Sequence, residues 1–382
     1  MNNSRYPFSW PIVSLGDICH INKSSLSEKT SKDYKFKYID LSSVDEGKIE
    51  FPTEDISFGE APSRARRKIN KNDIIISTVR PNLKGFAFID FDSTNFICST
   101  GFAVLTAKEH AYNRYIYQLL YSKNIETQIN NMLVGSNYPA INSSDVASLK
   151  IALPPLAEQE KIAGILGTWD EAIEKLSSLI EQKKLLKKGL MQRLLTGKTR
   201  LNGFTQPWKD YELSDLLDYE QPTKYLVNDI LKYSKEKVPV LTANKAFILG
   251  STDDTCGIYC KGNCIIFDDF TTDMKYVTFP FKVKSSAIKI LTSKENVILK
   301  FVFEQMKRIK YPLGGHKRYY LSEYQYITIR VPDITEQQAI ADVLSTADEE
   351  IDLLNKKLEA LKEQKKGLMQ QLLTGQIRVK VN

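Results

Sequence analysis

An internal repeat constrains this chain more than any other feature of its sequence, because a fold that is built twice must place each repeated element twice. Residues 153–200 align without a gap with residues 331–378, and 24 of the 48 aligned positions are identical. Each copy begins with a proline and a Glu-Gln pair and ends with Leu-Leu-Thr-Gly. A weaker repeat precedes each copy, where Trp10–Ile18 resembles Trp208–Leu216. The chain therefore alternates a globular segment with a long helix, twice.

Each strongly repeated segment predicts an amphipathic helix of about 38 residues, which is about 57 Å long. Its apolar residues follow the alternating steps of three and four that are typical of a coiled-coil seam. The first seam contains Ile162, Leu166, Trp169, Ile173, Leu176, Ile180, Leu190 and Leu194, with lysines at positions 183 and 187. The second contains Ile340, Leu344, Ala347, Ile351, Leu354, Leu358, Leu361, Leu368 and Leu372, with a lysine at position 365. Because each helix has a partner in the same chain, we expect an antiparallel intramolecular pair rather than simple dimerisation.

Local signals set the ends of these helices. Thr335 and Gln338 have the spacing of a capping box at the start of the second helix. Gly197 and Gly375 are expected to stop the two helices. The sequence between the helices mixes strand-like and helix-like runs, and 42% of all residues are hydrophobic, which is enough for a core in each segment. We therefore predict an α+β protein with a mixed α/β globular domain at 1–152, a central coiled-coil helix at 153–200, a second mixed α/β domain at 201–330 and a C-terminal coiled-coil helix at 331–382.

The composition argues against several classes of protein. No apolar run is long enough to span a membrane, and the first residues do not form a signal peptide, so we expect a cytoplasmic protein with no membrane partner. Five cysteines are too few for a disulfide scaffold. Three of them, Cys256, Cys260 and Cys264, lack the paired spacing of a zinc site, so no metal site is expected.

Motifs for catalysis are also missing from the sequence. The run Gly197-Lys198-Thr199 resembles the end of a phosphate-binding loop, but Gln192 stands where that loop needs a glycine. No dinucleotide-binding glycine motif and no nucleophile elbow is present. We interpret the acidic group Asp268, Asp269 and Asp273 as a solvated turn rather than a nuclease site. No catalytic residue and no bound cofactor is therefore expected in this chain.

Basic residues gather in loops of both globular segments, although the net charge is only +7. Arginine and asparagine at strand ends suit the edges of guanine and adenine, and lysine suits phosphate. Any single basic loop is more simply explained as a solvated one, so the argument depends on matching clusters in both segments. The candidate DNA-binding residues are Arg64, Arg66, Arg67, Arg80, Asn82 and Lys84 in the first segment and Asn244, Lys245, His316, Lys317 and Arg318 in the second.

At the level of motifs, the chain resembles the DNA-specificity subunit of type I restriction–modification systems. The resemblance is carried by Leu153–Gln159 with its second copy Val331–Gln337, and by the two Gly-Leu-Met-Gln helix endings. Four motifs of the first segment look like a recurring target-recognition domain: 61–66, 76–81, 99–105 and 135–141. The last of these adds Asn137 and Tyr138 to the candidate DNA-binding residues. The second segment departs from the pattern, because it has no counterpart of the Ser-Thr-Val-Arg-Pro run at 77–81.

The resemblance implies a function and a set of partners. Each globular segment would be a target-recognition domain that reads one half of a split, asymmetric site in double-stranded DNA. The helices would form an antiparallel spacer with pseudo-two-fold symmetry and would dock two methyltransferase subunits, which restriction subunits join. Adenine methylation and cleavage would belong to those partners, with S-adenosylmethionine, ATP and Mg²⁺ bound there. We expect the partner contact beside Glu158, Gln159, Glu336 and Gln337, on exposed helix faces.

Three alternatives remain open at this point. A two-domain coiled-coil scaffold that binds proteins would lack the salt-dependent DNA affinity that phosphate contacts produce. A nuclease that acts alone would cleave DNA with magnesium. A silent, exchangeable specificity cassette would have the same sequence as an active subunit.

Overall fold

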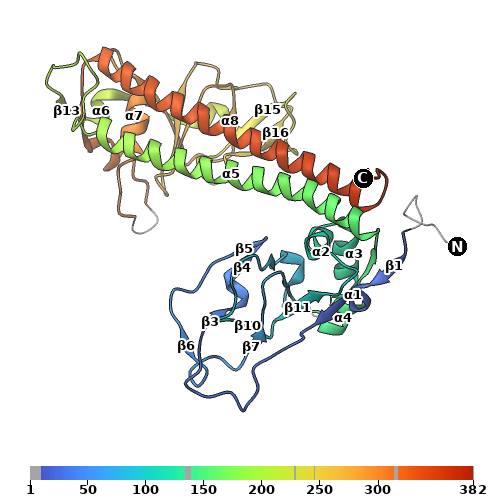
Figure 1. Cartoon of the computed structure of the whole chain (residues 1–382). Helices are drawn as coiled ribbons and strands as arrows, with labels where there is room; N and C mark the ends of the chain where they lie inside the picture. Colours follow the sequence, from blue (N-terminus) through green and yellow to red (C-terminus); the bar gives the residue numbers. More distant parts are fainter. Residues whose placement is uncertain (1–9, 134–138, 228, 245, 314–316, 382) are drawn as a thin grey trace. The chain divides into compact units, whose positions relative to one another are not determined.

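The structure is a computed structural model that describes residues 10–133, 139–227, 229–244, 246–313 and 317–381 (Figure 1). The chain forms two compact units, of which the first contains residues 1–177 and 356–382 and the second contains residues 178–355. Each unit combines one globular domain with part of each long helix. In the part of the chain that the structure describes, no helix is long and apolar enough to cross a lipid bilayer.

The first globular domain is built on two four-stranded sheets. One sheet has the order β2-β11-β8-β9 and is antiparallel throughout; its strands are β2 (Cys19–Ile21), β11 (Phe102–Ala107), β8 (Ile74–Ser77) and β9 (Phe86–Phe88). The other has the order β6-β3-β10-β7, with β3 and β10 parallel; its strands are β6 (Ile56–Ser57), β3 (Lys35–Ile39), β10 (Phe96–Ser99) and β7 (Ala65–Lys68). Short elements complete the domain: β1 (Ile12–Ser14) paired with β12 (Lys150–Ala152), β4 (Val44–Asp45) paired with β5 (Lys48–Ile49), α1 (Leu15–Ile18), α2 (Asn113–Leu120), α3 (Lys123–Met132), α4 (Ser143–Ser148), η1 (Leu41–Ser43) and η2 (Pro81–Leu83).

The second globular domain repeats this plan with different residues. Its antiparallel sheet has the order β14-β20-β17-β18, from β14 (Leu217–Glu220), β20 (Ile288–Ser293), β17 (Cys264–Asp268) and β18 (Met274–Val277). Its second sheet has the order β16-β15-β19, with β15 and β19 parallel, from β16 (Ile248–Thr252), β15 (Val238–Leu241) and β19 (Lys282–Val283). Short elements again complete the domain: β13 (Lys209–Glu212) paired with β21 (Thr328–Val331), α6 (Leu213–Leu216), α7 (Leu299–Met306), η3 (Pro222–Tyr225) and η4 (Tyr324–Tyr326).

Strand pairing makes the two domains topologically equivalent. β2, β11, β8 and β9 correspond in order and direction to β14, β20, β17 and β18. The parallel pair β3 and β10 corresponds in the same way to β15 and β19. The internal repeat therefore extends from the helices into the globular domains, where sequence comparison detects only its first residues.

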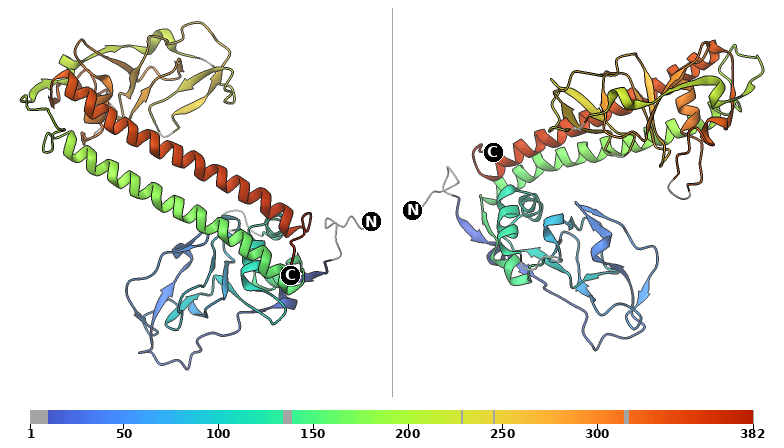
Figure 2. Two further views of the ribbon diagram at one scale, coloured as in Figure 1. Left: turned by 45° about the horizontal axis from the view of Figure 1, so that its top comes forward. Right: turned by 180° about the vertical axis from the view of Figure 1, so that it is seen from behind.

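The two long helices are α5 (Leu156–Leu194) and α8 (Ile334–Leu373), of 39 and 40 residues. In the first unit, Asp170 of α5 pairs with Lys365 of α8, and Ile162 and Leu166 share a core with Leu368 and Leu372. In the second unit, the seam leucines near the end of α5 share a core with Ile340 and Leu344 near the start of α8. The segments of the two helices within each unit therefore run side by side and antiparallel (Figure 2), which confirms the predicted architecture.

The ends of the helices agree only in part with the sequence analysis. Gly197 and Gly375 follow α5 and α8 with φ of +68° and +72°, a left-handed conformation that glycine adopts at little cost. The capping box at Thr335 was wrong. Asp333 caps α8 instead, because its Oδ1 accepts hydrogen bonds from the amides of Thr335 and Glu336, both at 3.0 Å.

Lysines in the seam are stabilised by aspartates of the opposite helix. Lys187 forms a short ion pair with Asp348, and Lys365 forms one with Asp170. The two pairs are related by the internal repeat, because Lys187 aligns with Lys365 and Asp170 aligns with Asp348. Each lysine can therefore occupy an otherwise apolar seam, since its charge has a partner there.

Candidate nucleic-acid interface

Loops of the first domain converge where β8 ends. The amide and the hydroxyl of Thr78 both donate to the carbonyl of Gly101, each at 2.8 Å, and the amide of Ile141 donates to the carbonyl of Thr78 at 2.9 Å. The amide of Thr100 donates to the carbonyl of Arg64 at 2.8 Å. These bonds tie together the loops that follow β6, β8 and β10 and the segment that begins at 139. Three of the motifs noted in the first globular segment, and residues 139–141 of the fourth, therefore meet where strands of the two sheets end.

Three of the candidate DNA-binding side chains are exposed on these loops: Arg64, Arg80 and Asn82. Arg80 has φ of +48°, which is uncommon for a residue with a side chain, and its amide donates to the carbonyl of Pro139 at 2.7 Å. The neighbouring loop thus holds Arg80 in a conformation that it would rarely adopt alone. Lys84 is half-buried, with its Nζ 3.7 Å from a carboxylate oxygen of Glu126.

Arg66 and Arg67 lie on strand β7 itself and are half-buried. The guanidinium of Arg66 packs 4.4 Å from the ring centre of Phe58 and donates to the carbonyl of Ala65 at 3.0 Å. Arg67 donates from Nη1 to the hydroxyl of Ser25 at 3.3 Å. Both guanidinium groups therefore contact the domain itself. Asn137 and Tyr138 lie outside the described residues.

The equivalent strand end of the second domain, after β17, also gathers several loops. The amide of Asp269 donates to the carbonyl of Ala287 at 3.1 Å, and the amide of Tyr319 donates to the carbonyl of Asp269 at 2.9 Å. The side chain of Asp269 accepts from the amide of Tyr320 at 2.7 Å and lies 3.2 Å from the Nζ of Lys289. Asp268 and Asp269 are both buried, so their interpretation as part of a solvated turn was wrong, whereas Asp273 is exposed.

Candidate residues of the second domain lie on these converging loops. Asn244 is exposed, and its Oδ1 accepts a hydrogen bond from the hydroxyl of Thr271 at 3.2 Å. Lys317 and Arg318 are exposed beside Tyr319, and Lys317 pairs with Glu323. The hydrogen bond that Lys317 donates to the carboxylate of Glu323 raises the pKa of Lys317. Lys245 and His316 lie outside the described residues.

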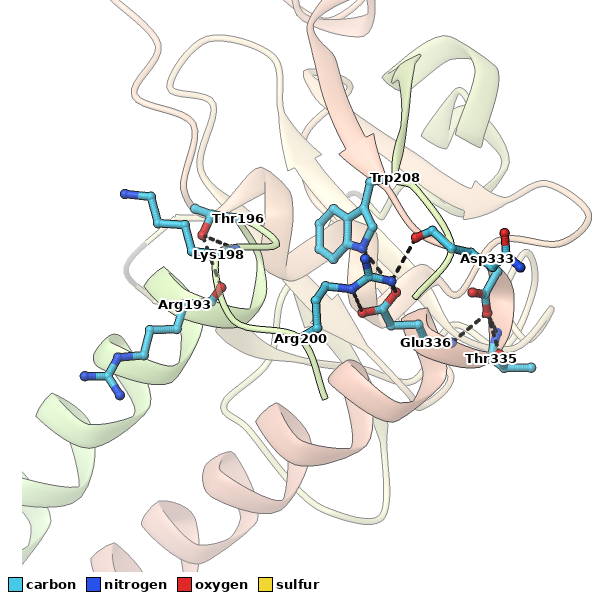
Figure 3. Close-up of polar contacts among 9 residues, drawn as sticks. Arg193, Thr196, Lys198, Arg200, Trp208, Asp333, Thr335 and Glu336 are labelled. Carbon is cyan, nitrogen blue, oxygen red and sulfur yellow. Dashed lines mark hydrogen bonds and ion pairs between the residues drawn. The ribbon is translucent and has the colours of Figure 1, made fainter. Parts of the chain in front are cut away.

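The two glutamates predicted to contact a partner are buried instead. The carboxylate of Glu336 accepts hydrogen bonds from the Nε and Nη2 of Arg200, both at 2.6 Å, and from the indole nitrogen of Trp208 at 3.1 Å (Figure 3). Glu158 makes the equivalent bidentate ion pair with Arg378, whose guanidinium lies 5.4 Å from the ring centre of Trp10. The Glu336 carboxylate thus joins the start of α8 to the segment that follows α5, and the Glu158 carboxylate joins the start of α5 to the segment that follows α8.

The neighbouring glutamines are buried for a similar reason. Gln159 accepts a hydrogen bond from the amide of Tyr112 at 2.8 Å and donates to the carbonyl of Pro154 at 2.8 Å. Gln337 accepts from the amide of Ile298 at 2.9 Å and donates to the carbonyl of Pro332 at 3.0 Å. The four side chains are therefore not exposed, because their polar atoms face their own unit. Partner contact on the helix faces beside them stays a prediction.

The cysteines of the second domain do not gather. Cys264 is buried in β17, where burial raises the pKa of its thiol to about 12, while Cys256 and Cys260 are exposed. Over the described ranges of the chain, no group of three or more His, Cys, Asp and Glu side chains is placed to hold a metal ion.

Two domains of one topology, each with polar and basic side chains on loops that meet at the same strand end, define a two-module nucleic-acid-binding protein. The family model for the type I restriction modification DNA specificity domain matches residues 7–182 and 205–363. The chain therefore belongs to the family of type I restriction–modification DNA-specificity subunits, and sequence-specific DNA recognition is its function.

Individual relatives agree with the family model. The chain is 44% identical over 138 residues to the EcoR124I/EcoR124II specificity subunit of Escherichia coli, a match that covers 35% of this chain and 34% of that subunit. It is 27% identical to the putative MjaX specificity subunit of Methanocaldococcus jannaschii, across 98% of this chain and 95% of that one. The crystal structure of the S subunit from M. genitalium superposes with a TM-score of 0.66 at 17% identity, covering 100% of this chain and 98% of that chain, which supports the fold.

Proposed function

We propose that this chain reads a bipartite, asymmetric sequence in double-stranded DNA, with one half-site for each globular domain. The observation that carries the proposal is the pair of loop clusters at equivalent strand ends, after β8 and after β17. Their exposed side chains differ, with Arg64 and Arg80 in one cluster and Asn244, Lys317 and Arg318 in the other. Equivalent scaffolds with different side chains suit two half-sites of different sequence.

The helices α5 and α8 would set the number of unread base pairs between the half-sites. Helix length is fixed at about 1.5 Å per residue, so a spacer of paired helices has a defined reach. In modular DNA-binding proteins, the separation of the modules determines the separation of the half-sites. This role rests on the continuous 39 and 40 residues of the two helices and on the ion pairs that join them.

The chemistry would belong to partner subunits of a type I restriction–modification complex. We place adenine methylation, with S-adenosylmethionine, on two methyltransferase subunits, and ATP- and Mg²⁺-dependent translocation and cleavage on restriction subunits. The proposed role of this chain is recognition alone, and it contributes no catalytic residue. The family membership supports this division. The chain also superposes, with a TM-score of 0.57 at 21% identity, on a structure that describes complex assembly of the type I R-M system.

Equilibrium DNA binding by the chain in complex with purified methyltransferase subunits tests the proposal. A duplex that contains the recognised sequence should bind more tightly than a scrambled duplex of equal length. The logarithm of the binding constant should fall linearly with the logarithm of the salt concentration. A protein-binding scaffold would give neither result. Equal affinity for both duplexes would contradict sequence recognition, and salt-independent affinity would contradict phosphate contact.

A further inference from the structure

We propose that the turn between β17 and β18, residues 268–273, is the base-reading element of the second domain, and that it recognises the methyl edge of a thymine through Phe270 and Thr271. This inference rests on the proposed function and adds to it the chemistry of the second half-site. The same position in the first domain carries Arg80 and Asn82, which suit guanine and adenine. The two half-sites would therefore be read by different kinds of contact.

Topology identifies the turn as the counterpart of the Arg80 loop. Both connect the two antiparallel strands at the same side of equivalent sheets, β8 to β9 and β17 to β18. Thr78 and Asp269 occupy equivalent positions. The amide of each donates to a carbonyl just before the neighbouring strand, Gly101 at 2.8 Å and Ala287 at 3.1 Å. The carbonyl of each accepts a hydrogen bond at 2.9 Å from the amide of a residue in a later loop. Two residues beyond Thr78 is Arg80, and two residues beyond Asp269 is Thr271. The sequence gives no hint of this relation, since the two loops differ in length and in composition.

The turn is rigid and yet presents an apolar ring. The buried carboxylate of Asp268 accepts hydrogen bonds from the amides of Phe270 and Thr271, both at 2.9 Å, and the amide of Asp268 donates to the carbonyl of Asp273 at 2.8 Å. Phe270 is nevertheless 40% exposed at the tip of this turn. A side chain that is held outside the core by a well-bonded backbone is preorganised for contact with a partner.

The charges around the turn are compatible with DNA. The carboxylate of Asp269 lies 3.2 Å from the Nζ of Lys289, and both side chains are 1% exposed, so its negative charge is compensated inside the domain. The carbonyl of Asp269 accepts a hydrogen bond from the amide of Tyr319, and its carboxylate accepts one from the amide of Tyr320. These bonds connect the turn to the loop that contains Lys317 and Arg318. Asp273 is an exposed carboxylate of the turn. Arg318 and Lys317, which pairs with Glu323, are exposed cations that can bind phosphates beside the turn.

The exposed side chains on and beside the turn indicate which base pair it would recognise. In the major groove, thymine is read by apolar contact with its C5-methyl group, for which phenylalanine and the threonine methyl are suitable, and adenine is read by asparagine. Phe270 and Thr271 provide the apolar contacts, and Asn244 is hydrogen-bonded to the Thr271 hydroxyl at 3.2 Å. The geometry therefore favours an A·T pair, whereas Arg80 at the first domain favours a G·C pair.

The test replaces each thymine of the second half-site in turn by uracil, which removes only the methyl group, and measures binding by the chain in complex with its methyltransferase subunits. For the unaltered chain, uracil at one position should weaken binding about fourfold, as expected for the loss of one buried methyl contact. Phe270→Ala and the polar variant Phe270→Gln should lose most of the difference between the thymine and uracil sites, with Thr271 as the remaining apolar contact. Their salt dependence should be unchanged, because no phosphate contact is lost.

Phe51→Ala is the matched control, because Phe51 is an exposed phenylalanine of the first domain, at 50%. It should retain the full uracil penalty in the second half-site. The proposal is overturned if no thymine of that half-site shows a penalty, or if both Phe270 variants keep it. Loss of all sequence preference by the unaltered chain would instead contradict the proposed function, so the two failures are distinguishable.

Discussion

Replacing Asp348 by alanine should destabilise the second unit by about 2 kcal/mol. Asp348 pairs with Lys187, whose side chain is only 9% exposed in the helix seam. Removing one partner of a fully buried ion pair costs roughly 3–5 kcal/mol, because the remaining charge is left unpaired in a medium of low polarity. Two facts reduce this figure: Asp348 itself is 37% exposed, and Glu304 remains 3.9 Å from the ammonium of Lys187.

Thermal unfolding measured by calorimetry or circular dichroism tests this value. A domain of this size loses roughly 2–4 °C in Tm for each kcal/mol, so the unfolding transition of the second unit should fall by about 4–8 °C. The double variant Lys187→Met with Asp348→Ala should recover most of the loss, because it leaves an apolar seam with no unpaired charge.

Two results would refute the reasoning about the seam. An Asp348→Ala variant as stable as the unaltered chain would mean that Lys187 reaches water without its partner. A double variant that is as unstable as the single one would mean that side-chain volume, and not the unpaired charge, determines the cost.

Three further predictions concern recognition, spacing and acid stability. Arg80→Ala should weaken binding at the first half-site by about 1–3 kcal/mol and relax the preference at one base pair, as measured by binding to single-base variants of the site; an unchanged preference would assign Arg80 a structural role. Deleting one heptad from each of α5 and α8 should change the number of unread base pairs in the methylated motif, as determined by sequencing, and an unchanged gap would contradict the spacer role. Burial alone would raise the pKa of Asp348, but the hydrogen bond from Lys187 and the charges of Lys187 and Lys300 lower it overall. The folded pKa therefore lies below the unfolded value of roughly 3.9. The stability that this carboxylate contributes is present above the unfolded pKa and is lost as the pH falls through the folded pKa. Acid titration of Tm should therefore show a smaller decrease below about pH 4 in Asp348→Ala than in the unaltered chain, and parallel decreases would contradict the assignment.

The helices were predictable from the sequence because their apolar spacing is regular over five heptads and occurs twice. The lysines of the seam were visible as exceptions, but their partners were not. Asp170 and Asp348 lie outside the seam pattern, and only the antiparallel register brings each of them to a lysine that is 195 or 161 residues away in the chain.

The repeated Glu-Gln pairs illustrate a different limit. The family resemblance led us to expect a partner contact on the helix faces beside Glu158, Gln159, Glu336 and Gln337. Their burial depends on Arg200 and Arg378, which follow the opposite ends of the helices and align with each other in the repeat. An arginine follows each of the two glutamates by 42 residues. This repetition was a signal in the sequence that could have identified the two buried ion pairs.

The interface was predictable only where the recognition motifs are present. In the first domain the sequence indicated Arg64, Arg80 and Asn82, which the fold places on converging loops. In the second domain the turn at Phe270, for which we propose base reading, was not a candidate from the sequence, because Asp268 and Asp269 suggested a solvated segment. Burial of these aspartates requires Lys289 and the amides of later loops, which are distant in the sequence.

Sequencing that detects DNA methylation, applied to the host genome with and without this gene, tests the central claim most directly. The account predicts that a split, asymmetric motif with methylated adenines is present in the unaltered strain and absent from the deletion strain. An identical set of methylated motifs in both strains would contradict the role of this chain as an active specificity subunit.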